Sequence, residues 1–162
     1  MTLKTDPDSL GFLLSETSRL MRNTLERRIA GTGLRIKPGE ARALIYVAAN
    51  EGARQSVIAE RMGVEPMTVC GYIGRLEKCG LVSRQPDPAD RRAKNVRTTD
   101  KADETIAAIR AEAGSMVEQA QAGLDAESRR LLLAALKHVR GNLIGLAGDS
   151  TGACRIPAGA DA

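Results

Sequence analysis

Apolar and polar residues alternate along this chain in a pattern that predicts helices separated by short turns. Leucine, isoleucine, valine, methionine and alanine recur every three or four residues, which places them on one face of an α-helix. Proline or a small polar residue precedes most of these runs, and glycine follows several of them, as at helix starts and ends. The pattern predicts six helices, over residues 7–30, 38–49, 57–62, 66–79, 100–120 and 126–147.

Polar side chains stand where they could cap four of these helices. Asp6 precedes Pro7, a pair that predicts an N-cap followed by the first helical residue. Ser56, Thr99 and Asp125 are expected to cap the third, fifth and sixth helices by accepting a hydrogen bond from a free backbone N–H.

Two short extended runs follow the fourth helix. They predict strands over residues 81–85 and 95–99, connected by a tip over residues 86–94. Pairing is expected to stop at Pro86 and Pro88, because proline has no N–H to donate to the ladder. Gly63 allows a sharp turn between the third and fourth helices. The order helix, turn, helix, hairpin over residues 55–99 predicts a winged helix-turn-helix, so the expected fold is mainly α with a small β-hairpin wing.

Composition narrows the class of protein. The chain has 162 residues, the size of one ordinary domain, and its core must be aliphatic because Phe12, Tyr46 and Tyr72 are its only aromatic residues. The three cysteines are widely spaced and form no Cys-x-x-Cys pair, so no disulfide framework, metal site or cofactor is expected. A secretion signal and an apolar run of roughly 20 residues are both missing, which predicts a cytoplasmic protein with no membrane partner.

An enzyme is not expected. The single histidine, His138, has no serine, cysteine or carboxylate placed with it in a recognisable catalytic arrangement, and no glycine-rich phosphate loop is present. The formal net charge of +4 is compatible with a polyanion partner, but a modest excess is weak evidence on its own.

The fourth predicted helix has a buried face and a free face. At 100° per residue, Val69, Ile73 and Leu76 fall within roughly 60° of one another. The opposite face is free to enter a major groove, which is wide enough for one helix. The glycines on this helix face, Gly71 and Gly74, either let the backbone approach DNA closely or are simply tolerated there. This face comprises Met67, Gly71, Gly74, Arg75 and Lys78, with Thr68 and Cys70 at its margins.

The hairpin is rich in positive charge. Five cations stand there against two carboxylates, namely Arg84, Arg91, Arg92, Lys94 and Arg97 against Asp87 and Asp90. An arginine on a narrow tip fits a minor groove, whose negative potential strengthens where the groove narrows. A winged helix used for protein contacts would present an apolar surface and no arginine-bearing tip.

The fourth helix and the hairpin together supply the candidate DNA-contacting residues. Thr68 can hydrogen-bond a base edge or a phosphate, and Met67 can contact a thymine methyl group. The basic residues can pair with phosphates, or they form an ordinary solvated surface. The candidates are Gln55, Ser56, Pro66, Met67, Thr68, Cys70, Gly71, Arg75, Lys78, Arg84, Asp90, Arg91, Arg92 and Lys94.

The segment over residues 55–99 resembles the MarR family of bacterial transcription regulators. Asp90 and Arg92 fit the family's wing signature of an aspartate, any residue and an arginine. The chain departs from the family at Thr98, where leucine is usual, and at Ala102, where glycine often stands. The matching stretches are residues 58–64 (IAERMGV), 67–69 (MTV), 75–82 (RLEKCGLV) and 87–96 (DPADRRAKNV).

The resemblance implies roles for particular residues and partners. Arg92 would insert into the minor groove, and Asp90 would hold it through a charge-assisted hydrogen bond. The resemblance also implies a homodimer with interleaved first and last helices, and a small-molecule effector bound between those helices and the winged lobe. The effector would be a small aromatic or anionic compound, and the candidate wall residues on the first two helices are Phe12, Ser15, Arg19 and Tyr46.

The helices outside the winged segment independently predict a dimer. Three amphipathic helices are too few to bury their own apolar faces as a separate domain, so a second copy is expected to close that core. A twofold dimer also matches a palindromic DNA site. The predicted organisation is a dimerisation helix over 7–34, a DNA-binding domain over 36–100, dimerisation helices over 101–147 and a disordered tail over 148–162.

The sequence therefore predicts a sequence-specific, double-stranded DNA-binding transcriptional regulator. We expect a repressor that binds a palindromic operator as a homodimer and is released by an effector. One alternative is a redox-responsive regulator that uses Cys70, whose thiol lies beside the predicted DNA face. The other interpretation of Cys70 is a small residue that only packs against its neighbours. The other alternative is a winged-helix module for protein interactions without DNA binding.

Overall fold

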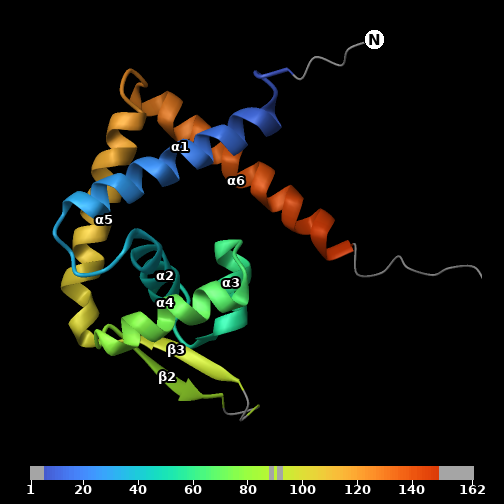
Figure 1. Ribbon diagram of the computed structural model, residues 1–162. Helices are drawn as coiled ribbons and strands as arrows, with labels where there is room; N and C mark the ends of the chain where they lie inside the picture. Colours follow the sequence, from blue (N-terminus) through green and yellow to red (C-terminus); the bar gives the residue numbers. More distant parts are fainter. Residues whose placement is uncertain (1–5, 88–89, 91–92, 150–162) are drawn as a thin grey trace, which may run out of the picture. The chain divides into compact units, whose positions relative to one another are not determined.

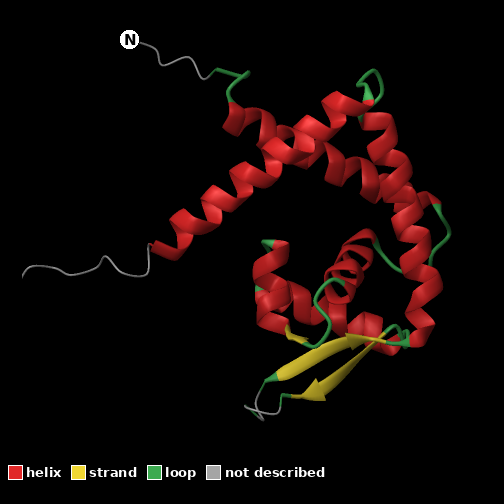
Figure 2. Ribbon diagram, turned by 180° about the vertical axis from the view of Figure 1, so that it is seen from behind, coloured by secondary structure: helices red, strands yellow, loops and turns green. Residues whose placement is uncertain are grey.

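The computed structural model describes residues 6–87, 90 and 93–149 of the chain. Its elements, in chain order, are α1 (Leu10–Gly31), α2 (Pro38–Ala48), β1 (Ala53–Arg54), α3 (Gln55–Met62), α4 (Pro66–Lys78), β2 (Val82–Pro86), β3 (Lys94–Thr98), the short 3-10 helix η1 (Asp100–Ala102), α5 (Asp103–Ala120) and α6 (Ala126–Asp149). The chain divides into two compact units, residues 1–119 and residues 120–162. The predicted class, mainly α with a small β-hairpin, is confirmed (Figures 1 and 2).

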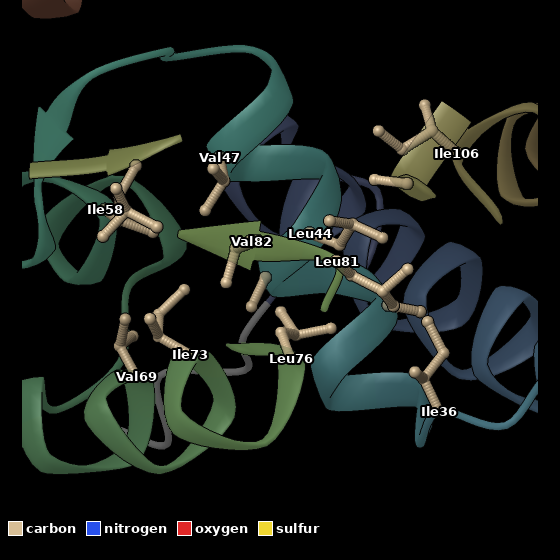
Figure 3. Close-up of a cluster of buried hydrophobic side chains, with 14 of the residues drawn as sticks. Ile36, Leu44, Val47, Ile58, Val69, Ile73, Leu76, Leu81, Val82 and Ile106 are labelled. Carbon is tan, nitrogen blue, oxygen red and sulfur yellow. The ribbon is translucent and has the colours of Figure 1, made fainter. Parts of the chain in front are cut away.

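The core of the first unit forms where α2, α3 and α4 pack together with the sheet. Its side chains are aliphatic, as the scarcity of aromatic residues requires (Figure 3). The predicted stripe of Val69, Ile73 and Leu76 on α4 is completely buried, which leaves the opposite face of that helix to solvent. The largest fully buried side chains are Leu44, Val47, Ile58, Val69, Ile73, Leu76 and Val96.

The sheet contains a third strand that the sequence pattern did not predict. The strand order is β1-β3-β2, all antiparallel, and Ala53 of β1 lies opposite Val96 of β3. Because β1 has only two residues, it is too short to show the alternation that identifies a strand. It fixes the start of α3 beside the base of the hairpin.

The hairpin pairs further toward its tip than expected. Pro86 lies opposite Lys94 in the ladder, so the prediction that pairing would stop at this proline was wrong. Proline is tolerated there because β2 is an edge strand and the adjacent pair carries the hydrogen bond, with the N–H of Asp87 donating to the carbonyl of Ala93 at 3.1 Å. Pro88 lies outside the described residues. Thr98, which stands in place of the family's usual leucine, pairs with Val82.

Two predicted helix starts are wrong, and both have a local cause. Helix α1 begins at Leu10 rather than Pro7, and Asp6 accepts the N–H of Asp8 at 2.9 Å in a turn ahead of the helix. Ser56 does not cap α3, because the helix already begins at Gln55 and the extended residue before it belongs to β1.

The two remaining caps give different results. Thr99 does hold the N-cap position of η1, but its hydroxyl donates to the carbonyl of Gly80 at 2.6 Å and caps nothing. The prediction for Asp125 is confirmed, since its Oδ1 accepts the N–H of Ser128 at 2.7 Å. That hydrogen bond holds the pKa of the Asp125 carboxyl below its ordinary value.

The second unit consists of the turn before α6 and α6 itself. The apolar stripe of this helix, which a second copy was expected to cover, is open to solvent within the chain: Leu143 is 57% exposed, and Leu132, Leu136 and Leu146 are exposed as well. The helix runs to Asp149, two residues into the segment predicted as a tail. Within the described residues, no helix combines the length and the apolar character needed to cross a bilayer.

Candidate nucleic-acid interface

Helix α4 presents a free surface opposite its buried stripe. Met67 is 80% exposed, and Thr68, Cys70 and Gly71 beside it are exposed as well. They occupy the first two turns of a helix that begins at Pro66. Their side chains are small or unbranched, so the helix backbone can approach a partner closely. The first turns of α4 are therefore accessible, as the sequence predicted.

The turn before α4 sets the direction of that helix. Gly63 ends α3 in the left-handed region at φ 62° and ψ 42°, a conformation that glycine adopts without a steric penalty. The predicted contacts Gln55 and Ser56 lie at the other end of α3 from this turn, and Gln55 is half-buried while Ser56 is exposed. The arrangement of α3, the turn and α4 is a helix-turn-helix.

Arg75 has protein partners in addition to the phosphate partner predicted for it. Its Nε donates to Oε1 of Glu40 on α2, and Glu40 itself is only 4% exposed. The second carboxylate oxygen of Glu40 accepts the N–H of Lys37 at 2.9 Å. The Arg75 guanidinium also lies 5.5 Å from the ring centroid of Tyr72. Arg75 therefore ties α4 to the start of α2, while about half of its side chain remains open to solvent.

Arg84 connects the wing to α4. Its Nη1 lies 3.4 Å from Oε2 of Glu77, and its Nη2 donates to the backbone carbonyl of Cys70 at 3.3 Å. The Arg84 side chain is mostly covered. A DNA phosphate would therefore have to bind a guanidinium that already contacts α4. Lys78 and Lys94, by contrast, are exposed.

The base of the wing is held by a carboxylate that sequence reasoning did not single out. Asp87 is only 8% exposed. Its Oδ2 accepts Nε of Arg54 at 2.8 Å, and its Oδ1 accepts the N–H of Asp90 at 3.1 Å. The hydrogen bond and the charge of Asp87 raise the pKa of Arg54 above its ordinary value. Asp87 thus joins β1, at the start of α3, to the segment that leads into the wing tip.

The tip itself lies partly outside the described residues. Arg91 and Arg92, the two predicted groove-contacting arginines, are not among them. Asp90 is exposed, and its carbonyl accepts the N–H of Ala93 at 2.9 Å. The role of Asp90 in holding Arg92 stays a prediction.

Replacing Asp87 with alanine is expected to weaken DNA binding while the chain stays folded. The substitution removes the acceptor for both Arg54 and the N–H of Asp90, so the end of β2 is no longer tied to β1 and to Asp90. We expect an affinity loss of about tenfold or more, since the loss of a single hydrogen bond to a charged group already has that effect. Fluorescence anisotropy with a labelled operator duplex measures it. Asp87→Asn keeps one acceptor oxygen and should lose less, and a loss under twofold for Asp87→Ala would contradict the clamp.

The cysteines and acidic groups show no further assembled site. Cys70 and Cys79 are exposed and free of disulfides in the described part of the chain. Over the same residues, no group of three or more His, Cys, Asp or Glu side chains could hold a metal ion. The redox alternative for Cys70 stays a prediction.

Two comparisons with known proteins agree with this geometry. Residues 36–93, from the start of α2 into the wing, match a family model described as the MarR family. The uncharacterized HTH-type transcriptional regulator YdgJ of Bacillus subtilis (strain 168) is 32% identical over 114 residues, which make up 70% of this chain and 68% of that protein. The chain belongs to the MarR family.

Solved structures share the fold of this MarR-family chain. The transcriptional regulator PA3341 is 34% identical with a TM-score of 0.71, and the match covers 85% of this chain and 99% of that one. The transcriptional repressor CouR, solved bound to a 23-mer DNA duplex, has a TM-score of 0.66 over 86% of this chain and 99% of its own. At 24% identity, CouR shows the fold alone. The protein is a MarR-family transcription regulator with a DNA-binding winged helix.

This MarR-family chain also has a cavity of about 310 Å³ between α1, α2 and α5. Its wall combines apolar side chains with three arginines and a carboxylate, namely Leu25, Ile29, Ile45 and Ile109 with Arg22, Arg42, Arg110 and Glu26. Of the four predicted effector residues, Tyr46 lines it, with the Arg42 guanidinium 5.7 Å from its ring centroid. Phe12, Ser15 and Arg19 do not line it and are exposed on α1. The arginines come from three helices, so their spacing in the sequence could not have grouped them.

Proposed function

We propose that this MarR-family regulator is a homodimeric repressor that binds a palindromic operator and leaves it when a small anionic effector binds. The observation that carries the proposal is the free face of α4 beside a hairpin with five basic residues. The first can enter a major groove, and the second fits phosphates and a minor groove. CouR, which shares the fold, was solved on a DNA duplex, so this fold can bind duplex DNA. A protein acting on operators works in the cytoplasm.

Exposed apolar residues on the outer helices support the dimer. On α1, Leu10, Leu13 and Leu20 are exposed. On α6, the exposed residues include Leu132, Leu136, Leu143, Ile144 and Leu146. Monomeric proteins rarely leave large apolar patches in water, and a second copy of the same chain would cover them. A twofold dimer would also present two α4 helices to one palindrome.

Selection from a random-sequence DNA pool tests the proposal. We expect the enriched duplexes to share an inverted repeat, and the bound complex to contain two chains per duplex by sedimentation. A reporter gene placed behind that repeat should be expressed less when the protein is present. Enrichment of no common sequence would overturn the proposal, and increased reporter expression would overturn the repressor role.

The cavity between α1, α2 and α5 supports an effector that is both apolar and negatively charged. Its aliphatic wall suits an aromatic ring, and Arg22 and Arg110 are exposed basic groups at its edge. Arg42 is already engaged, because it donates to the carbonyl of Met62 at the end of α3. A ligand that draws Arg42 away from Met62 would therefore disturb α3, the helix before α4. In this way binding at the cavity could change the position of the DNA-facing helix α4.

Replacing Arg22 and Arg110 with methionine is expected to weaken the binding of such a ligand without weakening DNA binding. Benzoate and phenylacetate serve as probes, and titration calorimetry measures their affinity. Each lost hydrogen bond to a charged group should cost about tenfold or more. Arg27→Met, on the same helix α1 but outside the cavity, is the matched control. Equal binding by all variants would contradict this site.

A further inference from the structure

Four basic residues gather at the C-terminal end of α4, from three segments far apart in the sequence. We call them the α4-end patch: Arg35 and Lys37 from the loop before α2, Lys78 from the last turn of α4, and Lys101 from η1. All four are exposed. Arg35 and Lys78 line two adjoining surface grooves together, and the grooves extend to Lys37 on one side and Lys101 on the other.

The positions of these residues are fixed by the fold. Ile36, between Arg35 and Lys37, is buried in the core and holds the loop against α4. Lys101 reaches back over the glycine that ends α4, since its Nζ lies 3.8 Å from the point where a Gly80 side chain would start. The fold therefore brings the four charges together, and they are not simply neighbours along one element.

The patch keeps its charge. In the part of the chain that the structure describes, none of its four residues forms an ion pair. The nearby carboxylates have other partners: Glu40 binds Arg75 and the N–H of Lys37, and Glu77 binds Arg84. Glu104 is the remaining carboxylate that lines the same grooves, so positive charge prevails.

The patch continues the DNA-facing surface of α4. Lys78 lies almost directly opposite the buried stripe, on the same side as Met67 and Gly71. From Met67 to Lys78 the helix rises roughly 16 Å, at about 1.5 Å per residue. A major groove is only about 12 Å wide, so a helix that crosses it with Met67 at the bases reaches the phosphates at the rim with Lys78.

We propose that the α4-end patch binds the sugar-phosphate backbone of the operator beyond the groove that α4 reads. This inference rests on the proposed function, since it needs an operator. The patch would add affinity without sequence preference, because phosphates are alike at every position. It compensates for a recognition face with few hydrogen-bonding groups and for Arg75 and Arg84, which are partly committed to protein partners.

The salt dependence of binding by a Lys78→Gln, Lys101→Gln double variant tests the proposal. The probe is the duplex enriched from the random pool, titrated over a range of potassium chloride concentrations. Each phosphate contact contributes about 0.9 to the slope of log affinity against log salt. A dimer carries each substitution twice, so the slope should fall by about 1.8 for each substituted position. Lys137→Gln, which removes an exposed lysine of α6, is the matched control and should leave the slope unchanged.

A second readout separates phosphate contact from a general effect of charge. Neutral methylphosphonate groups are placed at single positions of the DNA backbone. At the contacted phosphates they should lower the affinity of the wild type and leave the affinity of the double variant unchanged. Lys78→Arg with Lys101→Arg should restore the slope. An unchanged slope in the double variant, or equal losses for both proteins at every position, would overturn the proposal. Enrichment of no duplex by the wild type would instead show that the proposed function itself is wrong.

Discussion

Replacing Arg92 with alanine is expected to weaken operator binding between roughly 30-fold and 10⁴-fold, while the dimer stays folded. An arginine placed in a groove contributes on the order of 1–3 kcal/mol, and a dimer with two wings loses that amount twice. The guanidinium suits a narrow minor groove because it carries a permanent charge on a planar group that is weakly hydrated. Equilibrium anisotropy at fixed salt measures the loss.

A matched control for this substitution lies on α6. Arg130 is exposed and paired with Glu127, with Nη2 and Oε1 2.6 Å apart, and it stands away from the apolar stripe of that helix. Arg130→Ala removes the same charge and should leave operator affinity within about twofold, as substitutions far from a site usually do. If Arg92→Ala behaves like Arg130→Ala, the wing does not insert an arginine. Arg92→Lys should fall between wild type and alanine, because charge alone retains part of the attraction.

The helix-turn-helix could be predicted from the sequence because each of its parts has a local cause. Pro66 starts α4, Gly63 and Gly80 provide left-handed turns, and the stripe from Val69 to Leu76 shows which face is buried. None of these depends on a distant part of the chain. The exposure of Met67 and Thr68 followed directly, since the opposite face was already assigned to the core.

The connections between elements could not be predicted, because they join residues far apart in the sequence. Arg54 and Asp87 are 33 positions apart, and Arg75 and Glu40 are 35 apart. Arginines were assigned to DNA by their charge and by their place on the free helix face or in the hairpin, whereas the structure shows that Arg75 and Arg84 also hold α4 to its neighbours. The short strand β1 likewise forms only because β3 offers it an open edge. A charged residue in a sequence pattern is predicted by default to face solvent. Only the folded structure shows which charged side chains are paired.

Replacing Leu143 with glutamate is expected to give a monomer that has lost about 10³-fold or more of its operator affinity. Leu143 is 57% exposed within its own chain, so the change removes little internal packing and should not unfold the monomer. In a dimer the glutamate would be buried against apolar side chains of the second copy, and an unpaired buried charge is strongly unfavourable. Specific DNA complexes have dissociation constants of about 10⁻⁸–10⁻¹¹ M, and a monomer retains only one of two half-sites.

Sedimentation and operator binding on the same samples distinguish this result from a folding defect. The wild type should sediment at twice the chain mass of 17.2 kDa, and Leu143→Glu at that mass with unchanged helical content by circular dichroism. Lys137→Glu introduces the same side chain about 120° around α6 from Leu143, at an already charged and exposed position, and should leave both mass and affinity as in the wild type. A dimeric Leu143→Glu variant would show that this stripe is not the contact between copies. A monomeric variant that still binds the full palindrome as tightly as the wild type would separate DNA recognition from dimerisation, because one winged unit would then suffice.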